Sequence, residues 1–149
     1  MNEERQTEGV EEQEKAPDIG LWRAGIVALF AAVLSNILAH YLLSFVLVYP
    51  QDFTPLRLTS IAILTGAGAL GATLLFARLH GRVKNPERTF RRFGWALVGL
   101  SILPTLVGAL RPDLIPLPGG STRGFLMLIP FHLIAGVVII GLLCRLPES

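Results

Sequence analysis

Three side chains could carry hydrogen-bonding or proton chemistry inside otherwise apolar segments: Asn36, His40 and His132. A polar side chain is costly in hydrocarbon unless it is paired or functional. His40 and His132 each lie eight residues from the expected outer end of their segment, about 12 Å deep at about 1.5 Å per helical residue. Thr65 and Ser101 fall close to the same depth. The sequence therefore predicts one polar layer within the membrane.

Three interpretations of this layer are open. In the first, neutral groups hydrogen-bond across the helices and hold them together. In the second, the layer is a small-molecule or proton-binding site reached from outside. In the third, His40 and His132 hold one haem, although we predict no cofactor because nothing else in the sequence provides for a macrocycle or its propionates.

We expect neither a metal site nor enzymatic activity. The only cysteine, Cys144, leaves no cysteine cluster for zinc or iron–sulfur binding. The apolar segments contain no Asp or Glu, and no serine has a nearby base on the same helix.

The elements that must position the polar layer are membrane-spanning helices. Of the 149 residues, 52% are hydrophobic and 16% are charged, which is unusual for a soluble domain. Runs of about 20 mostly apolar residues are long enough to cross a bilayer. We predict an all-α membrane protein whose four transmembrane helices form an antiparallel bundle, with spans at about 22–49, 58–79, 93–110 and 124–144.

Charge fixes the expected orientation. Residues 1–20 contain seven acids and two bases and predict an acidic, disordered cytoplasmic tail before the transmembrane domain at 21–146. Residues 78–92 contain six bases against the single acid Glu87, and short basic loops stay in the cytoplasm. We therefore expect a multi-pass plasma-membrane protein with both termini inside.

The basic loop at 78–92 is expected to contact anionic lipid headgroups and not nucleic acid. The residues proposed for this contact are Arg82, Lys84, Arg88, Arg91 and Arg92.

Small residues indicate where helices would meet, because helices in lipid associate through close backbone approach. In the second span the expected packing stripe consists of Ala67, Gly68, Gly71 and Ala72, and Thr65 with Ala69 extends it. In the first span a comparable stripe recurs every three or four residues: Gly25, Ala28, Ala32, Asn36, His40 and Ser44.

A family resemblance follows from Asn36 and His40 in the first span, the segment Pro86–Arg92, Ser101 with Pro104, and His132. With these residues the chain, from about residue 22 onward, resembles a bacterial membrane-protein family known as domain of unknown function 6069. The resemblance implies four helices and a bacterial origin, and supplies no activity.

From the sequence we expect a small membrane protein that acts through contacts with other membrane proteins, a second copy of itself or lipids, as an accessory or scaffold subunit. The alternative is a small-molecule or proton-binding protein with a polar site in the outer half of the bundle. A haem-binding redox protein is the remaining possibility.

Overall fold

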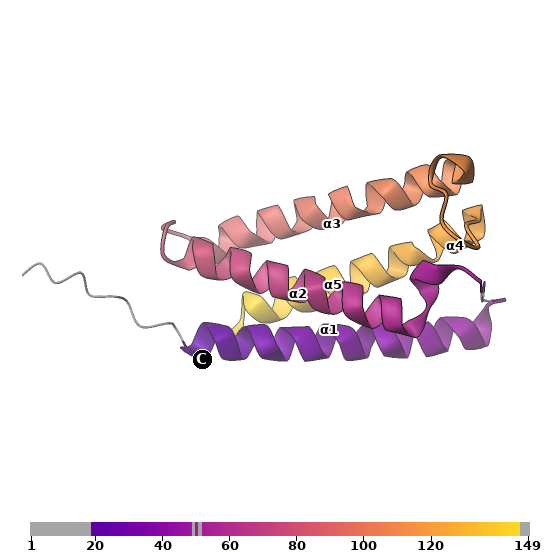
Figure 1. Ribbon diagram of the computed structural model, residues 1–149. Coiled ribbons are helices and arrows are strands. Elements are labelled where there is room, and N and C mark those ends of the chain that lie inside the picture. Colours follow the sequence, from indigo (N-terminus) through magenta and orange to yellow (C-terminus); the bar gives the residue numbers. More distant parts are fainter. Residues whose placement is uncertain (1–18, 49, 51, 147–149) are drawn as a thin grey trace, which may run out of the picture.

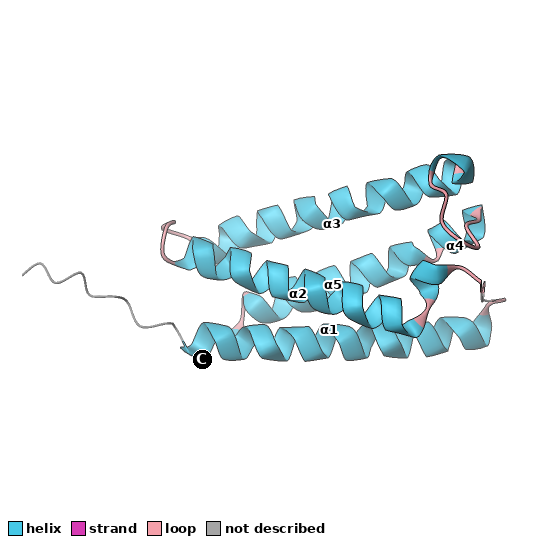
Figure 2. Cartoon of the chain, in the orientation of Figure 1, coloured by secondary structure: helices cyan, strands magenta, loops and turns pink. Residues whose placement is uncertain are grey.

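The computed structural model describes residues 19–48, 50 and 52–146. Within them the chain is helical, without strands (Figure 2). The helices are α1 (Ile19–Val46), α2 (Leu58–His80), α3 (Pro86–Leu110), α4 (Thr122–Leu126) and α5 (Leu128–Leu143), with short 3₁₀ turns η1 (Thr54–Leu56) and η2 (Pro112–Leu114). Four helical segments, with α4 and α5 forming the last, are long and apolar enough to cross a membrane, as the sequence predicts. Residues 1–18 of the expected acidic tail lie outside the described residues.

Two boundaries differ from those expected. The third span was expected to begin at residue 93, but α3 begins at Pro86, so only residues 81–85 connect α2 and α3. Proline suits a first helical turn, where its missing N–H would have no intrahelical partner. The fourth span is not one helix, because it breaks between α4 and α5 at Met127. Pro130 follows closely and cannot donate the helical hydrogen bond to the carbonyl of Leu126.

The four spans form a bundle in which α1 packs against α2 and α5, while α3 packs against α2, α4 and α5 (Figure 1). α1 and α3 therefore occupy opposite corners. α2 and α3 are closest at their short connection and diverge toward their other ends in Figure 1. This divergence separates two neighbouring helices over much of their length.

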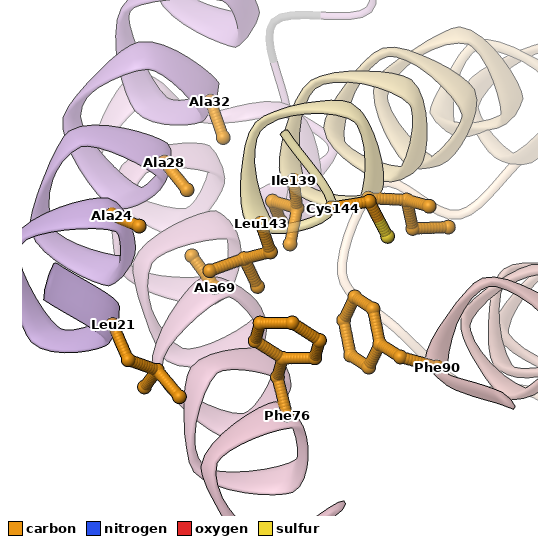
Figure 3. Packing of buried hydrophobic residues seen from close by; sticks show 11 residues of the cluster. Leu21, Ala24, Ala28, Ala32, Ala69, Phe76, Phe90, Ile139, Leu143 and Cys144 are labelled. Carbon is orange, nitrogen blue, oxygen red and sulfur yellow. The ribbon is translucent and has the colours of Figure 1, made fainter. Parts of the chain in front are cut away.

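One core cluster lies at the end of the bundle that holds the α2–α3 connection (Figure 3). Ala24, Ala28 and Ala32 bring α1 close to its neighbours, and Phe76 meets Phe90 with ring centroids 5.0 Å apart. The small residues of α1 thus leave room for large side chains from the facing helices.

A second cluster lies at the opposite end, where the connections before α2 and α4 fold together. The side chain of Phe53 is fully buried, and its ring centroid is 4.9 Å from that of Phe125. Gly119 has a φ of 71°, and a Cβ there would overlap the backbone of Asp52. Only glycine fits this combination of left-handed backbone and close approach.

Candidate functional site

Asn36 joins three helices. Its side chain reaches from α1 to α2 and α5, where Nδ2 donates to Thr65 Oγ1 at 2.8 Å and to the carbonyl oxygen of Phe131 at 3.2 Å. The residue is 1% exposed. Among the described residues, Asn36 Oδ1 has no hydrogen-bond partner. One half of the amide therefore connects the helices while the other half presents an unpaired acceptor.

A 180° rotation of the Asn36 amide, which exchanges Oδ1 and Nδ2, would not remove the unpaired acceptor. A flipped amide would place Oδ1 against the Phe131 carbonyl, so two acceptors would face each other without a hydrogen. The unpaired oxygen is thus a consequence of what surrounds Nδ2. A buried acceptor without a partner costs about 1–3 kcal/mol.

Asn36 lines a pocket of about 670 Å³ between α2, α3 and α5, and it is the one α1 residue that does so. Small-molecule pockets in proteins have volumes of about 300–1,000 Å³. On α2 the pocket extends from Ile61 to Leu75, about 21 Å at 1.5 Å per residue. Leu64 on α2 and Leu97 on α3 line it and are 64% and 50% exposed, so the pocket opens sideways where these helices diverge.

The two ends of the pocket differ in polarity. Four of the five residues predicted for the polar layer line it together: Asn36, Thr65, Ser101 and His132. They lie toward the end where α4 and α5 meet. The remainder of the wall consists of glycines and apolar side chains, ending near Phe90 and Ile139. The pocket is therefore an elongated, mostly apolar groove whose polar groups gather toward one end.

His40, the fifth predicted residue, does not line this pocket. Its ring lies edge-on to that of Tyr41, with centroids 5.6 Å apart. The buried face of α1 follows Ala28, Ala32 and Asn36 and then passes through Ala39, which leaves His40 half-buried beside it. The expected layer thus separates into a pocket with one histidine and a second histidine outside its wall.

The prediction that Ala67, Gly68, Gly71 and Ala72 pack α2 against another helix is wrong within this chain. Ala67, Gly68 and Gly71 are exposed and Ala72 is half-buried. A Cβ added at Gly68 or Gly71 would meet nothing within 4 Å. Gly68, Gly71 and Ala72 instead line the pocket, so their small size creates space and does not bring backbones together.

The buried packing face of α2 consists of Ile61, Thr65, Ala69, Thr73 and Phe76. Thr65 and Ala69 belong to the stripe predicted from the sequence, whereas Ile61, Thr73 and Phe76 do not. A Cβ at Gly25 of α1 would overlap the side chain of Thr73. A Cβ at Gly136 of α5 would come within 2.6 Å of Val98 on α3. A four-residue repeat of Thr65, Ala69 and Thr73 was the available signal, but nearly every residue from 65 to 73 is small, so several stripes fit equally well.

Charged side chains separate between the two ends of the bundle. Glu87 is the only acid at the basic end among the described residues. Eight exposed bases lie there: Arg23, Arg78, Arg82, Lys84, Arg88, Arg91, Arg92 and Arg145. The five bases proposed for headgroup contact are all among them. At the opposite end Arg111 pairs with Asp113 through two hydrogen bonds of 2.8 and 3.1 Å. This guanidinium lowers the pKa of the exposed Asp113 carboxyl.

Cys144 lies just beyond α5, at the basic end. It is 5% exposed, and its Sγ donates to the carbonyl oxygen of Glu87 at 3.8 Å. Burial raises the pKa of this thiol. The side chain fills the core as an apolar group would, and little reactive thiolate forms at neutral pH.

Comparison with known proteins gives a family and no activity. A family model described as "Family of unknown function (DUF6069)" matches residues 17–148. No curated protein and no solved structure matches the chain.

Proposed function

Since the chain belongs to the family of unknown function DUF6069, whose model carries no activity, we propose its function from the pocket: it is a membrane protein that binds a lipophilic small molecule between α2, α3 and α5. We further propose that it lies in the plasma membrane with both termini in the cytoplasm. The observation that carries the proposal is an apolar pocket with polar groups gathered at one end.

The pocket favours ligand binding over the scaffold role expected from the sequence. Hydrogen bonds that only join helices need no adjacent space, because close packing provides the remaining stabilisation. Here Gly68 and Gly71 leave open volume in the same pocket that Asn36 lines. A volume of about 670 Å³ suits a small molecule.

The ligand would enter from the bilayer. Leu64 and Leu97 are large exposed side chains that line the pocket, and both belong to membrane-spanning helices. Such side chains face lipid chains when the bundle is in a membrane. A molecule dissolved in the bilayer can therefore reach the pocket sideways, without crossing water.

Anionic lipid headgroups are the second proposed contact. The basic end presents eight exposed bases around the cytoplasmic face expected from the positive-inside rule. Each base near such a surface contributes about 1 kcal/mol of attraction. This contact would hold the bundle at a fixed depth in the membrane while molecules dissolved in the bilayer enter the pocket.

The pocket can be tested with a photoreactive alkane that carries a diazirine, added to purified protein in lipid nanodiscs. We expect saturable labelling on the pocket-lining parts of α2, α3 and α5, mapped by mass spectrometry. Gly68→Leu should abolish most of it, because the new side chain enters open space inside the pocket.

Gly99→Leu is the matched control. A Cβ at Gly99 also meets nothing within 4 Å, but Gly99 does not line the pocket. Its labelling should match that of the wild type. Labelling spread evenly over the helix surfaces and unchanged by Gly68→Leu would refute the proposed binding function.

A further inference from the structure

We infer that the ligand carries a neutral hydroxyl group that donates a hydrogen bond to Asn36 Oδ1, while its apolar chain lies along α2 toward Leu75. This inference rests on the proposed ligand-binding function and specifies the chemical class of the ligand. The inference follows from the hydrogen bonds that polar groups at the polar end of the pocket already make within the protein.

Three polar groups that line this end use their own hydrogens within the protein. Both hydrogens of Asn36 Nδ2 point to Thr65 and Phe131. The hydroxyl of Ser101 donates to the carbonyl of Val98 at 2.7 Å. His132 Nδ1 lies 2.8 Å from the carbonyl of Leu128, which can only accept, so this nitrogen carries the hydrogen.

What remains for a ligand at these groups is a set of acceptors. Asn36 has its unpaired Oδ1 and Ser101 its oxygen lone pairs. The His132 tautomer that carries its hydrogen on Nδ1 leaves Nε2 as a further acceptor. A ligand carbonyl or ether would place another acceptor among them and could pair only with the hydroxyl hydrogen of Thr65, whose oxygen accepts from Asn36. A ligand hydroxyl supplies the missing hydrogen, so the pocket should select donors.

A neutral donor fits better than an ammonium group. Among the residues that the structure describes, no carboxylate lines the pocket, so a cation would lack a counter-ion in a low-dielectric site. Asn36 Oδ1 is the acceptor that we assign to this donor, because it has no other hydrogen-bond partner among the described residues. The atom is buried in the protein without ligand, so a small shift of the amide or its neighbours must accompany binding.

The position of the ligand hydroxyl also fixes the direction in which the ligand's alkyl chain runs. Thr65 marks the polar end on α2, and Gly68, Gly71 and Leu75 continue the pocket wall toward the basic end. The two glycines offer a groove without side chains. From Thr65 to Leu75 the pocket wall extends about 15 Å at about 1.5 Å per helical residue, and a single unbranched alkyl chain can follow it.

The test compares 1-hexadecanol with hexadecyl methyl ether as competitors of the photoreactive alkane, using the full chain in nanodiscs. The two molecules share the same chain, and only the alcohol can donate. We expect the alcohol to compete about tenfold better in the wild type, the effect of one net hydrogen bond to an otherwise unpaired acceptor. Asn36→Leu should remove this preference.

The outcomes separate this inference from the proposed function. Equal competition by alcohol and ether, with both binding events lost in Gly68→Leu, would refute hydroxyl recognition and leave the pocket as a binding site. Labelling insensitive to both competitors and to Gly68→Leu would refute the binding function itself. If Asn36→Leu does not fold, the comparison of alcohol and ether in the wild type still decides the inference.

Discussion

Asn36 Nδ2 on α1 lies 2.8 Å from Thr65 Oγ1 on α2. This buried hydrogen bond joins two helices through residues that are 29 positions apart in the sequence. Thr65→Val keeps the shape of the side chain and removes the acceptor. We expect a loss of about 1 kcal/mol in the free energy of unfolding, the usual size for a hydrogen bond between membrane helices. Unfolding in mixed detergent micelles would measure it.

Thr73→Val is the control for that substitution. The Thr73 hydroxyl donates to the Ala69 carbonyl of its own helix at 2.8 Å, so its loss breaks no bond between helices. An equal loss of stability in Thr65→Val and Thr73→Val would contradict the role given to the Asn36–Thr65 bond.

Two classes of glycine should respond differently to leucine. Gly25→Leu and Gly136→Leu should prevent normal folding, because even a Cβ overlaps Thr73 or Val98 across a helix interface. Gly68→Leu and Gly71→Leu should be tolerated, since each side chain enters open space. Overpacking in a close-packed interior costs about 1–3 kcal/mol or more. Aggregation temperatures in detergent would show the contrast, and similar temperatures for all four variants would argue against this helix packing.

Orientation can be tested with single cysteines. On a Cys144→Ala background, Thr122→Cys should react with a membrane-impermeant maleimide on intact cells, whereas Asn85→Cys should react only after lysis. Both positions are exposed and lie at opposite ends of the bundle. The expectation rests on the bases around the α2–α3 connection. Labelling of Asn85→Cys from outside would invert the topology.

The basic end should bind anionic lipid. Replacing Arg88, Arg91 and Arg92 together with Gln should reduce the phosphatidylglycerol that remains bound on native mass spectrometry. Each exposed base adds about 1 kcal/mol of attraction to an anionic surface. The matched variant changes Arg57, Arg111 and Arg123, the bases of the opposite end. Equal lipid loss in both triple variants would mean that charge alone, without its location, governs the contact.

The native thiol should be nearly inert. Cys144 is buried and its pKa is raised, so maleimide should modify folded wild-type protein slowly and denatured protein quickly. Because the raised pKa keeps the thiol protonated at neutral pH, reaction should accelerate as pH rises toward that pKa. Rapid labelling of the folded protein at neutral pH would show that this end of α5 opens.

The sequence by itself determined the number of spans, their helical nature and the segregation of bases. These features depend on local quantities: the length of an apolar run, the thickness of hydrocarbon and the charge of short connections. It also identified Asn36, Thr65, Ser101 and His132 as one group, because depth along antiparallel helices follows from counting residues.

Only the tertiary structure decided which faces meet. Residues 65–73 are small on nearly every side, so their pattern allows several packing stripes, and the fit of Thr73 against Gly25 selects one of them. The rotation of α1 likewise separates His40 from the pocket, although residue counting predicts the same depth for His40 and His132. Residue spacing gives the position of a side chain along its helix. Which neighbouring helix each face contacts depends on how all the helices pack together.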